Sequence, residues 1–359
     1  MNILFFLPSL SKRGGVEQST VTLLNSLVKN TSNHVFLLVL NYNKSNVTFK
    51  LDKDIIILDL KIVNYKKQFF TLIKRVRKEI KTHNITHFIT VETMGLLFTF
   101  IPFFTLKHRP KFIVWEHFNF YNNNGKRLRD FLRKVAARYA DLVVTLTVRD
   151  VDSWKENLKI KHKISHIYNI SPFEDENSTY DIGSKKVISI GRYVDVKGFD
   201  RLIKAWSIFE NKYNIYDWEL SIIGYGGLKD SLQELITSLG CKSISLVDGS
   251  IGVIDQYKEA SIYCMASYHE GLPMVLIEAQ SFGLPAISFD IYAGPSEILG
   301  CGSGILVEDG NLEAYADAIY TLANSNELRA MMSNVAIANK HRFDSAIIAD
   351  EWVDQLENL

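Results

Sequence analysis

Short apolar segments alternate with amphipathic segments along the whole chain. Apolar runs of about four to eight residues are typical of buried strands, and apolar residues spaced three or four positions apart are typical of helices. The runs predict strands at 3–9, 34–40, 55–60, 87–91, 111–117, 142–147, 163–168, 186–192, 219–224, 243–248, 261–266, 285–290 and 304–308. Helices are predicted near 16–29, 66–82, 94–106, 127–140, 149–157, 198–212, 228–239, 253–260, 273–283, 311–340 and 344–357. This alternation predicts parallel sheets covered by helices on both faces.

One segment interrupts the alternation. Residues 169–186, NISPFEDENSTYDIGSKK, are rich in turn-forming and charged residues, as domain linkers are. A chain of 359 residues also exceeds one ordinary hydrophobic core. We therefore expect an α/β protein with two doubly wound domains, 1–170 and 171–343, facing each other across a cleft. A final helix within 344–359 can pack on the first domain. Open parallel sheets bind ligands at the carboxyl ends of their strands, so the cleft is the expected active site.

Charge is distributed unevenly between the two halves. Residues 1–170 hold 28 Lys and Arg against 12 Asp and Glu, whereas residues 171–359 hold 13 against 28. A basic half predicts an anionic partner beside the first domain, either a membrane surface or a nucleic acid. The sequence contains no recognisable nucleic-acid recognition module, and its aromatic residues fall mainly in core-like patterns. We therefore expect no nucleic acid as a partner.

The sequence also limits where the protein works. Its N-terminus, MNILFFLPSL, has no basic leader and no small-residue cleavage site, so we interpret it as a strand and not as a signal peptide. The apolar run 94–104 is shorter than the roughly 20 residues that a membrane span needs. Cys241, Cys264 and Cys301 lack CxxC spacing and are expected as reduced thiols. We expect a cytoplasmic protein, soluble or peripheral on a membrane.

Glycines and cations follow several of the predicted strands. Gly14 and Gly15 in SLSKRGGVEQST either let backbone amides approach a ligand at a helix N-terminus or form a plain tight turn. Gly224 in SIIGYGG lies at another strand end. Arg192 and Lys197 in GRYVDVKG could neutralise a diphosphate, Arg through two parallel hydrogen bonds and Lys as a point charge. The alternative is that both cations are solvated surface residues.

Two further stretches carry candidate chemistry. His117 in FIVWEHFNF lies at the end of a strand and is either a hydrogen-bonded structural residue or part of a site. In HEGLPMVLIEA, Pro273 suits the first position of a helix, so free amides at 271–275 could bind an anion. Glu270 and Glu278 cannot share one helix face, which favours contacts with different parts of one long ligand. Alternatively, Glu270 complements the helix dipole and Glu278 faces solvent.

These residues resemble those of retaining, nucleotide-sugar-dependent glycosyltransferases of family 4, which have the GT-B fold. The resemblance covers nearly the whole chain. It rests on Gly14-Gly15 with Glu17, His117, GRYVDVKG, HEGLPMVLIEAQSFGLPAIS, GPSEIL (294–299) and GILVEDGN (304–311).

The resemblance implies a role for each matching residue. Arg192 and Lys197 would bind the diphosphate, Glu278 the ribose and Glu270 the donor sugar, while His117 would lie near the transferred sugar. The remaining donor-binding positions would be Gly14, Gly15, Gly224, Gly271, Leu272, Pro273 and Met274. Transfer would proceed by front-face attack without a metal ion or any cofactor other than the nucleotide sugar. Such a reaction depends on stabilising the leaving diphosphate more than on a carboxylate nucleophile.

The substrates are implied less directly. SFDIYAGPSEIL and YHEGLP resemble transferases that build O-antigens, capsules and lipid-linked oligosaccharides. They imply transfer of a hexose or N-acetylhexosamine from UDP-N-acetylgalactosamine, UDP-galactose or UDP-N-acetylglucosamine to a polyprenyl-diphosphate-linked saccharide of a bacterial surface polysaccharide. A mannosyltransferase that uses GDP-mannose and a sugar-nucleotide epimerase remain open, because both share the skeleton.

Two basic amphipathic segments, 61–81 and 125–140, could lie on anionic lipid at the cytoplasmic face of the inner membrane. The alternative for each segment is an ordinary helix that packs its apolar face on the sheet.

Overall fold

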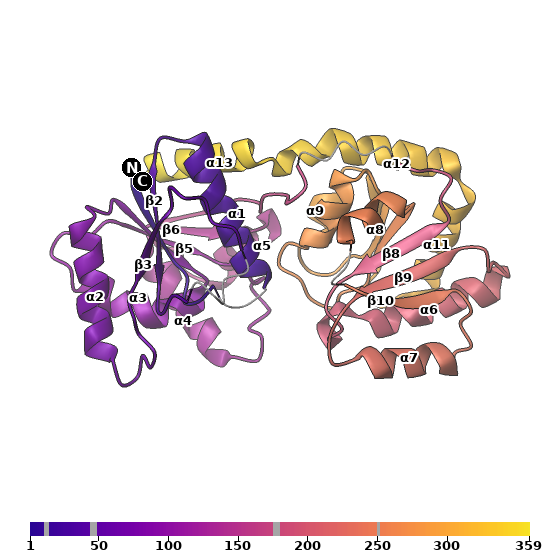
Figure 1. The fold of residues 1–359 in the computed structure, drawn as a ribbon, viewed down its shortest axis with the longest axis horizontal. Coiled ribbons are helices and arrows are strands. Elements are labelled where there is room, and N and C mark those ends of the chain that lie inside the picture. Colours follow the sequence, from indigo (N-terminus) through magenta and orange to yellow (C-terminus); the bar gives the residue numbers. More distant parts are fainter. Residues whose placement is uncertain (11–13, 44–48, 175–179, 250–251) are drawn as a thin grey trace. The chain divides into compact units, whose positions relative to one another are not determined.

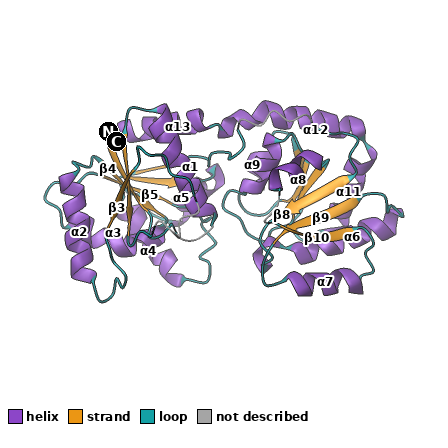
Figure 2. Ribbon diagram, in the orientation of Figure 1, coloured by secondary structure: helices purple, strands orange, loops and turns teal. Residues whose placement is uncertain are grey.

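The chain forms two compact units in a computed structural model (Figure 1). The structure describes residues 1–10, 14–43, 49–174, 180–249 and 252–359. Unit 1 consists of Met1–Ile170 and Asp344–Leu359, and unit 2 consists of Ser171–Phe343. Each unit contains one parallel sheet flanked by helices (Figure 2). In unit 2, α8 and α9 lie on one side of the sheet and α6 and α7 on the other.

Unit 1 is built on the seven-stranded sheet β3-β2-β1-β4-β5-β6-β7, in which each pair of neighbours is parallel. Its strands are β1 (Asn2–Phe6), β2 (His34–Val39), β3 (Ile56–Asp59), β4 (His87–Val91), β5 (Lys111–Trp115), β6 (Leu142–Thr145) and β7 (Lys163–His166). Its helices are α1 (Gly15–Asn30), α2 (Phe69–Thr82), α3 (Leu96–Phe104), α4 (Arg127–Tyr139), α5 (Val148–Asn157) and α13 (Ser345–Glu357). From β1 the chain adds β2 and β3 on one side, and it then adds β4 to β7 on the other side. The switch point therefore lies between β1 and β4, and ligands bind at such points in open α/β sheets.

The C-terminal helix α13 belongs to unit 1 because its aromatic side chain enters the core there. Trp352 is fully buried, with its ring 5.1 Å from that of Trp115 and 6.2 Å from that of Phe5. The Nε2 atom of His87 lies 3.1 Å from the carbonyl oxygen of Leu356. These contacts tie the end of the chain to β1, β4 and β5.

Unit 2 is built on the six-stranded parallel sheet β10-β9-β8-β11-β12-β13. Its strands are β8 (Lys186–Ile190), β9 (Glu219–Gly224), β10 (Ile244–Asp248), β11 (Ile262–Met265), β12 (Ala286–Phe289) and β13 (Gly304–Val307). Its helices are α6 (Phe199–Tyr213), α7 (Lys229–Ser238), α8 (Val253–Glu259), α9 (Met274–Ser281), α10 (Pro295–Leu299), α11 (Leu312–Asn324) and α12 (Asn326–Asn339). The switch point of this sheet lies between β8 and β11.

The predicted fold class of two doubly wound α/β units is confirmed, and each predicted strand is present. One helix prediction was wrong, and one helix was missed. The single helix expected over 311–340 is broken at Ser325, whose side chain accepts a hydrogen bond from the Leu328 amide (3.1 Å) and caps α12. The short helix α10 was not predicted. In the described part of the chain, none of the helices has the length and apolar character that a membrane span requires.

Candidate functional site

Glycines bring three strand ends of unit 2 close together. A Cβ atom added to Gly224, the last residue of β9, would lie 1.8 Å from the carbonyl oxygen of Gly191, which follows β8. A Cβ atom added to Gly198, whose φ is +61°, would lie 1.8 Å from the carbonyl oxygen of Ala266, which follows β11. Only glycine permits these approaches. The switch point of unit 2 is therefore lined by closely packed backbone, as a phosphate-binding surface requires.

Two cations lie at this switch point in different electrostatic states. Lys197, at the end of the short 3-10 helix 195–197, places its Nζ atom 2.7 Å from Oε1 of Glu270. Arg192 is exposed, and its side chain forms no hydrogen bond or ion pair with a residue that the structure describes. The charge of Lys197 is thus already paired, whereas the guanidinium group of Arg192 is available to a bound anion.

Helix α9 begins one residue later than the sequence suggests. Pro273 is the N-cap, with an extended backbone (φ −74°, ψ 100°), and not the first helical residue. The Leu276 amide already donates to the Pro273 carbonyl oxygen (3.0 Å), so Met274 and Val275 carry the N–H groups without an intrahelical partner. The anion site predicted over 271–275 is accordingly shorter.

Gly294 of the GPSEIL motif packs on this loop. It has φ +98°, and an added Cβ atom would lie 2.3 Å from Cδ of Pro273 and 2.9 Å from the carbonyl oxygen of Gly271. The motif thus supports the loop before α9.

Glu278 points into the protein from the second turn of α9. The Tyr257 hydroxyl group donates to Oε2 of Glu278 (2.7 Å), and the Tyr257 ring is fully buried, 4.9 Å from that of Phe282. Burial raises the pKa of Glu278, while the hydrogen bond from Tyr257 and the charge of Lys197 oppose that shift. Glu278 is thus half-buried and hydrogen-bonded to a core residue, and not a fully solvated surface residue. Its Oε1 atom forms no hydrogen bond with a described residue, so one oxygen can accept bonds from a ligand.

His117 follows β5 in unit 1 and is 8% exposed. Its ring lies 4.2 Å from that of Trp115, and its buried Nε2 atom has no hydrogen-bond partner among the described residues. Burial, assisted by the charge of Arg129, lowers the pKa of His117 to about 3. The imidazole is therefore neutral and keeps one nitrogen for a ligand.

A buried ion cluster supports the residues around His117. Glu116 is buried and contacts Arg129 (3.2 Å) and Arg133 (3.4 Å), and its Oε2 atom accepts a hydrogen bond from the Thr93 hydroxyl group (2.6 Å). Arg129 also reaches Glu92 (3.3 Å). The cluster ties α4 to the ends of β4 and β5. It also means that Arg129 and Arg133 face the interior, although the sequence offered the cations of 125–140 to lipid.

The sequence analysis did not identify this cluster. The signals present in the sequence are two carboxylates at strand ends, Glu92 after the strand at 87–91 and Glu116 in the strand at 111–117.

Gly14 and Gly15 lie at the carboxyl end of β1, beside the switch point of unit 1. Gly14 caps α1 with an ordinary extended backbone (φ −121°), so no special conformation requires glycine there. An added Cβ atom at Gly14 would lie 2.3 Å from Oε2 of Glu17, whereas at Gly15 it would meet no atom of a described residue within 4 Å. The surface over Gly15 is thus open to a ligand.

Comparison with known proteins identifies the family. The model of the glycosyl transferases group 1 matches residues 172–338, which include Arg192, Lys197, Glu270 and Glu278. Residues 172–338 match the group 1 glycosyltransferases, and the chain is a glycosyltransferase. An "Uncharacterized glycosyltransferase" of Haemophilus influenzae is 29% identical to it over 352 residues, with 97% of this chain and 98% of that protein covered.

A second relative has a more specific name. The GalNAc-alpha-(1->4)-GalNAc-alpha-(1->3)-diNAcBac-PP-undecaprenol alpha-1,4-N-acetyl-D-galactosaminyltransferase of Campylobacter jejuni is 26% identical over 367 residues. That alignment covers 98% of this chain and 97% of the relative. Among solved structures, Anabaena HepE in complex with UDP is similar over the full length of both chains, with a TM-score of 0.80 and 17% identity. The likeness supports the GT-B fold for this glycosyltransferase.

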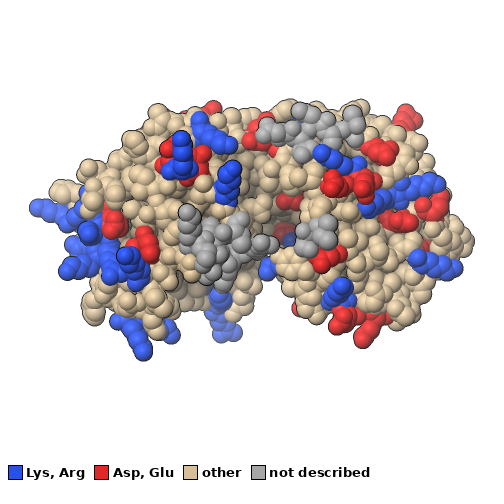
Figure 3. All heavy atoms as spheres, in the orientation of Figure 1, with Lys and Arg blue, Asp and Glu red and all other residues tan. Residues whose placement is uncertain are grey.

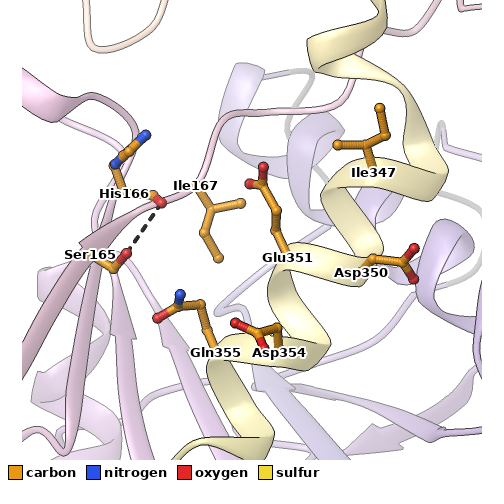
Figure 4. A pocket seen from close by; sticks show the side chains of 8 residues that line it. All are labelled: Ser165, His166, Ile167, Ile347, Asp350, Glu351, Asp354 and Gln355. Carbon is orange, nitrogen blue, oxygen red and sulfur yellow. Dashed lines mark hydrogen bonds between the residues drawn. The ribbon is translucent and has the colours of Figure 1, made fainter.

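A pocket elsewhere in unit 1 of the glycosyltransferase has the opposite charge from a phosphate site. It lies between the end of β7 and α13, has a volume of about 580 Å³ and is lined in part by Asp350, Glu351 and Asp354 (Figure 4). Burial raises the pKa of Glu351. An acidic lining repels a diphosphate, so this pocket is not a second donor site.

Proposed function

We propose that this glycosyltransferase moves a hexose or N-acetylhexosamine, with retention of configuration, from a UDP-sugar to a polyprenyl-diphosphate-linked saccharide of a bacterial surface polysaccharide. The observation that carries the proposal is the arrangement at the switch point of unit 2. The exposed Arg192 and the Lys197–Glu270 ion pair lie in the segments that follow strands β8 and β11. The hydrogen bond between Tyr257 and Glu278 joins the adjoining helices α8 and α9. The name of the Campylobacter relative and the UDP in the HepE structure support the acceptor class and the nucleotide.

The diphosphate would lie against Arg192 and the N-terminus of α9. A guanidinium group can donate two parallel hydrogen bonds to phosphate oxygens, and the N–H groups of Met274 and Val275 add a positive helix end. Negative charge on the diphosphate grows as the glycosidic bond breaks. Cations that are held in place before the reaction stabilise this charge in the transition state. In this proposal Arg192 and Lys197 supply that stabilisation, and no metal ion is needed.

Glu270 and Glu278 would bind the two ends of the donor. The Oε2 atom of Glu278 accepts a hydrogen bond from Tyr257, which leaves Oε1 to accept hydrogen bonds from ribose hydroxyl groups. Glu270 would accept a hydrogen bond from the donor sugar while its charge is balanced by Lys197. The donor would thus be held at both ends, with its diphosphate beside the cations.

Unit 1 would contribute the acceptor side. The neutral imidazole of His117 would form a hydrogen bond with the transferred sugar through Nε2, and Gly14 and Gly15 would pass close to the donor phosphates. The basic surface of unit 1 would lie on anionic lipid at the cytoplasmic face of the inner membrane. That position would suit an acceptor carried on a polyprenyl diphosphate.

A donor panel tests the proposal. The full-length protein is incubated with UDP-N-acetylgalactosamine, UDP-galactose, UDP-N-acetylglucosamine or GDP-mannose, and with a polyprenyl-diphosphate-linked saccharide in detergent. Mass spectrometry then follows the acceptor. A product heavier by one hexose or N-acetylhexosamine from a UDP-sugar is the expected outcome. Transfer only from GDP-mannose would replace the donor assignment, and turnover of UDP-N-acetylglucosamine without an acceptor would indicate an epimerase.

Variants test the site. Arg192→Ala is expected to lower kcat about 10²–10³-fold, as loss of one transition-state donor does. Glu278→Ala is expected to raise the donor KM about 10-fold or more, because a hydrogen bond to a charged group is lost. Lys204→Ala, which removes an exposed cation of α6 paired with Asp200, is the matched control and should behave as wild type. Turnover at the wild-type rate in Arg192→Ala or Glu278→Ala would overturn the site assignment.

A further inference from the structure

We propose that Glu92 is an acceptor-binding residue: its carboxylate accepts a hydrogen bond from a hydroxyl group of the acceptor saccharide in unit 1. The inference rests on the proposed function, because it assigns a residue to the acceptor of that reaction. No motif of the sequence drew attention to Glu92.

The position of Glu92 is that of a ligand-binding residue. It directly follows β4, and β1 and β4 form the switch point of the unit 1 sheet. Val91 pairs with Trp115 in the parallel register, and the Glu92 amide donates to the Trp115 carbonyl oxygen (2.8 Å). Glu92 therefore lies at the switch point, within electrostatic reach of Glu17 in the first turn of α1 and next to the end of β5, after which His117 follows. Ligands of open α/β sheets bind at such a point.

The backbone of Glu92 is strained. Its φ of 60° and ψ of 148° fall beside a region that is almost restricted to glycine, and such conformations cost of the order of 1–3 kcal/mol. The bonds that impose it are the one to Trp115 and one from the Gly95 amide to the Glu92 carbonyl oxygen (3.0 Å). Glycine would serve the backbone better at this position. A glutamate here is accounted for if its side chain has a function.

The side chain has capacity for a ligand. Within the ion cluster, Glu116 is fully buried and contacts both Arg129 and Arg133, whereas the Glu92 side chain is 21% exposed. The Oε2 atom of Glu92 is 3.3 Å from Arg129, and Oε1 forms no hydrogen bond with a described residue. The Nε2 atom of His117, on the neighbouring strand end, is likewise without a partner among the described residues. A carboxylate oxygen and a neutral imidazole nitrogen are thus both available at adjoining strand ends, as binding of a sugar hydroxyl group requires.

The charges that face Glu92 make its protonation sensitive to pH near neutrality. Burial and the carboxylates of Glu116, at the end of β5, and Glu17, on α1, outweigh Arg129 of α4 and raise the pKa of Glu92 to about 7. The ionised carboxylate only accepts hydrogen bonds, whereas the protonated carboxyl group turns one oxygen into an O–H donor and is a weaker acceptor. Acceptor binding should therefore strengthen as the pH rises through about 7, and weaken below it.

A purely structural role would have a different signature. If Glu92 only neutralised Arg129, Glu92→Gln would change stability but not the acceptor kinetics, because the amide oxygen of glutamine can still accept the Arg129 hydrogen bond. Glu92→Gly separates the two roles further, since glycine relieves the positive φ and removes the carboxylate. If the strained backbone is retained because the carboxylate binds acceptor, the Glu92→Gly protein should fold but bind acceptor weakly.

The experiment compares wild type, Glu92→Gln, Glu92→Gly and the control Glu79→Gln in the full-length protein. Glu79 is a matched control because it lies on α2 of unit 1, its side chain is 24% exposed, and it pairs with His83, the C-cap residue of that helix. Steady-state rates are measured from pH 5.5 to 8.5 with the donor that wild type uses and with a polyprenyl-diphosphate-linked saccharide as the varied substrate. Binding of the same acceptor is also measured without donor, and thermal unfolding checks the fold.

For the acceptor, kcat/KM of Glu92→Gln is expected to fall about 10–100-fold, the range of a hydrogen bond to a charged group. In this variant the increase of the acceptor kcat/KM through about pH 7 should disappear, while the donor KM and the rate of donor hydrolysis stay at wild-type values. Glu79→Gln should match wild type.

Wild-type acceptor affinity and an unchanged pH profile in Glu92→Gln would overturn the inference and leave the proposed function intact. If wild type transfers no sugar from any donor, the proposed function fails. The binding measurement then still decides: equal affinity of wild type and Glu92→Gln for the acceptor, or no affinity in either, overturns the role of Glu92.

Discussion

His117 is a neutral histidine beside a charged cluster. Its ring is buried, and Arg129 adds positive charge nearby, so burial and this cation together lower its pKa to about 3. A protonated imidazole at this position would have to lose its hydration next to a guanidinium group. The residue can therefore bind a sugar hydroxyl group but cannot act as a cation towards a phosphate at physiological pH.

The neutral state of His117 predicts a pH dependence of stability. Its pKa falls from 6.5 in the unfolded chain to about 3 in the folded one, so between these values only the unfolded chain binds the proton. The free energy of unfolding of wild type should decrease, relative to His117→Asn, by about 1.4 kcal/mol per pH unit below about pH 6. Denaturant titrations of both proteins at pH 7, 6 and 5 measure the difference. If the free energies of unfolding of the two proteins differ by the same amount at all three pH values, His117 is not buried in its neutral form.

Some properties of single residues could be predicted from the sequence and others could not. The sequence places Arg192 after a strand and Glu278 inside a helix, because both statements depend on local pattern. The ion pair of Lys197 with Glu270 could not be predicted. It depends on β8 and β11 being neighbours in the sheet, although their last paired residues, Ile188 and Tyr263, are 75 positions apart in the sequence. The hydrogen bond between Tyr257 and Glu278 could not be predicted for the same reason.

Two helices of unit 1 look alike in sequence and differ in the structure. Both α2 and α4 are basic and amphipathic, but α4 turns Arg129 and Arg133 towards Glu116. On α2, the core side is made of Leu72, Val76 and Ile80. The exposed cations of this helix are Lys74, Lys78 and Lys81. The difference arises because a buried carboxylate at the end of β5 needs cations from α4, a requirement that no local pattern contains.

The surface of α2 combines cations with an exposed aromatic ring, the features on which the proposed membrane contact rests. Lys and Arg side chains gather over this part of unit 1 (Figure 3), and a shallow hollow of about 310 Å³ is lined by Phe70, Ile73, Lys74, Arg77, Lys78 and Lys81. Phe70 is 84% exposed, which is unusual for a large aromatic side chain at a surface without a partner. Cations around an exposed aromatic ring are typical of helices that lie in the lipid headgroup region.

Replacing these cations should weaken lipid binding. Each surface cation contributes about 1 kcal/mol on anionic lipid, so Lys74→Ala with Lys78→Ala should lower the vesicle partition coefficient about 30-fold, and Phe70→Ala should lower it further. Sedimentation with vesicles containing phosphatidylglycerol measures this, with phosphatidylcholine vesicles for comparison. Lys204→Ala with Lys229→Ala, two exposed lysines of unit 2, provides the matched control. If the α2 variant and this control bind the vesicles equally, α2 does not contribute to lipid binding.

At the scale of the whole molecule, the chain makes unit 1 from two separate segments. It leaves unit 1 at Ile170, forms all of unit 2 and returns at Asp344. The α/β class was predictable because the central strands of the sheets, such as Ile3–Phe6, are continuous apolar runs that are buried on both faces. The destination of the last helix was only one option in the sequence, since an amphipathic helix can cover any apolar surface. The structure decides it through Trp352, which fits beside Phe5 and Trp115.

Trp352→Ala should therefore destabilise unit 1 and leave unit 2 unchanged. Truncating a fully buried tryptophan costs about 3–5 kcal/mol, because the cavity cannot close completely. Ile347→Ala, on the same helix but 43% exposed, should cost far less and controls for changes in helix propensity.

The emission of the remaining tryptophans distinguishes the two units during denaturation, since Trp115 and Trp154 lie in unit 1 and Trp206 and Trp218 in unit 2. Single-tryptophan versions of each variant should show the unit 1 transition at lower denaturant concentration in Trp352→Ala, with the unit 2 transition in its wild-type place. A shift of the unit 2 transition by the same amount would mean that the two units unfold as one. A wild-type unit 1 transition would mean that the core of unit 1 is complete without its returning helix, which contradicts the full burial of Trp352.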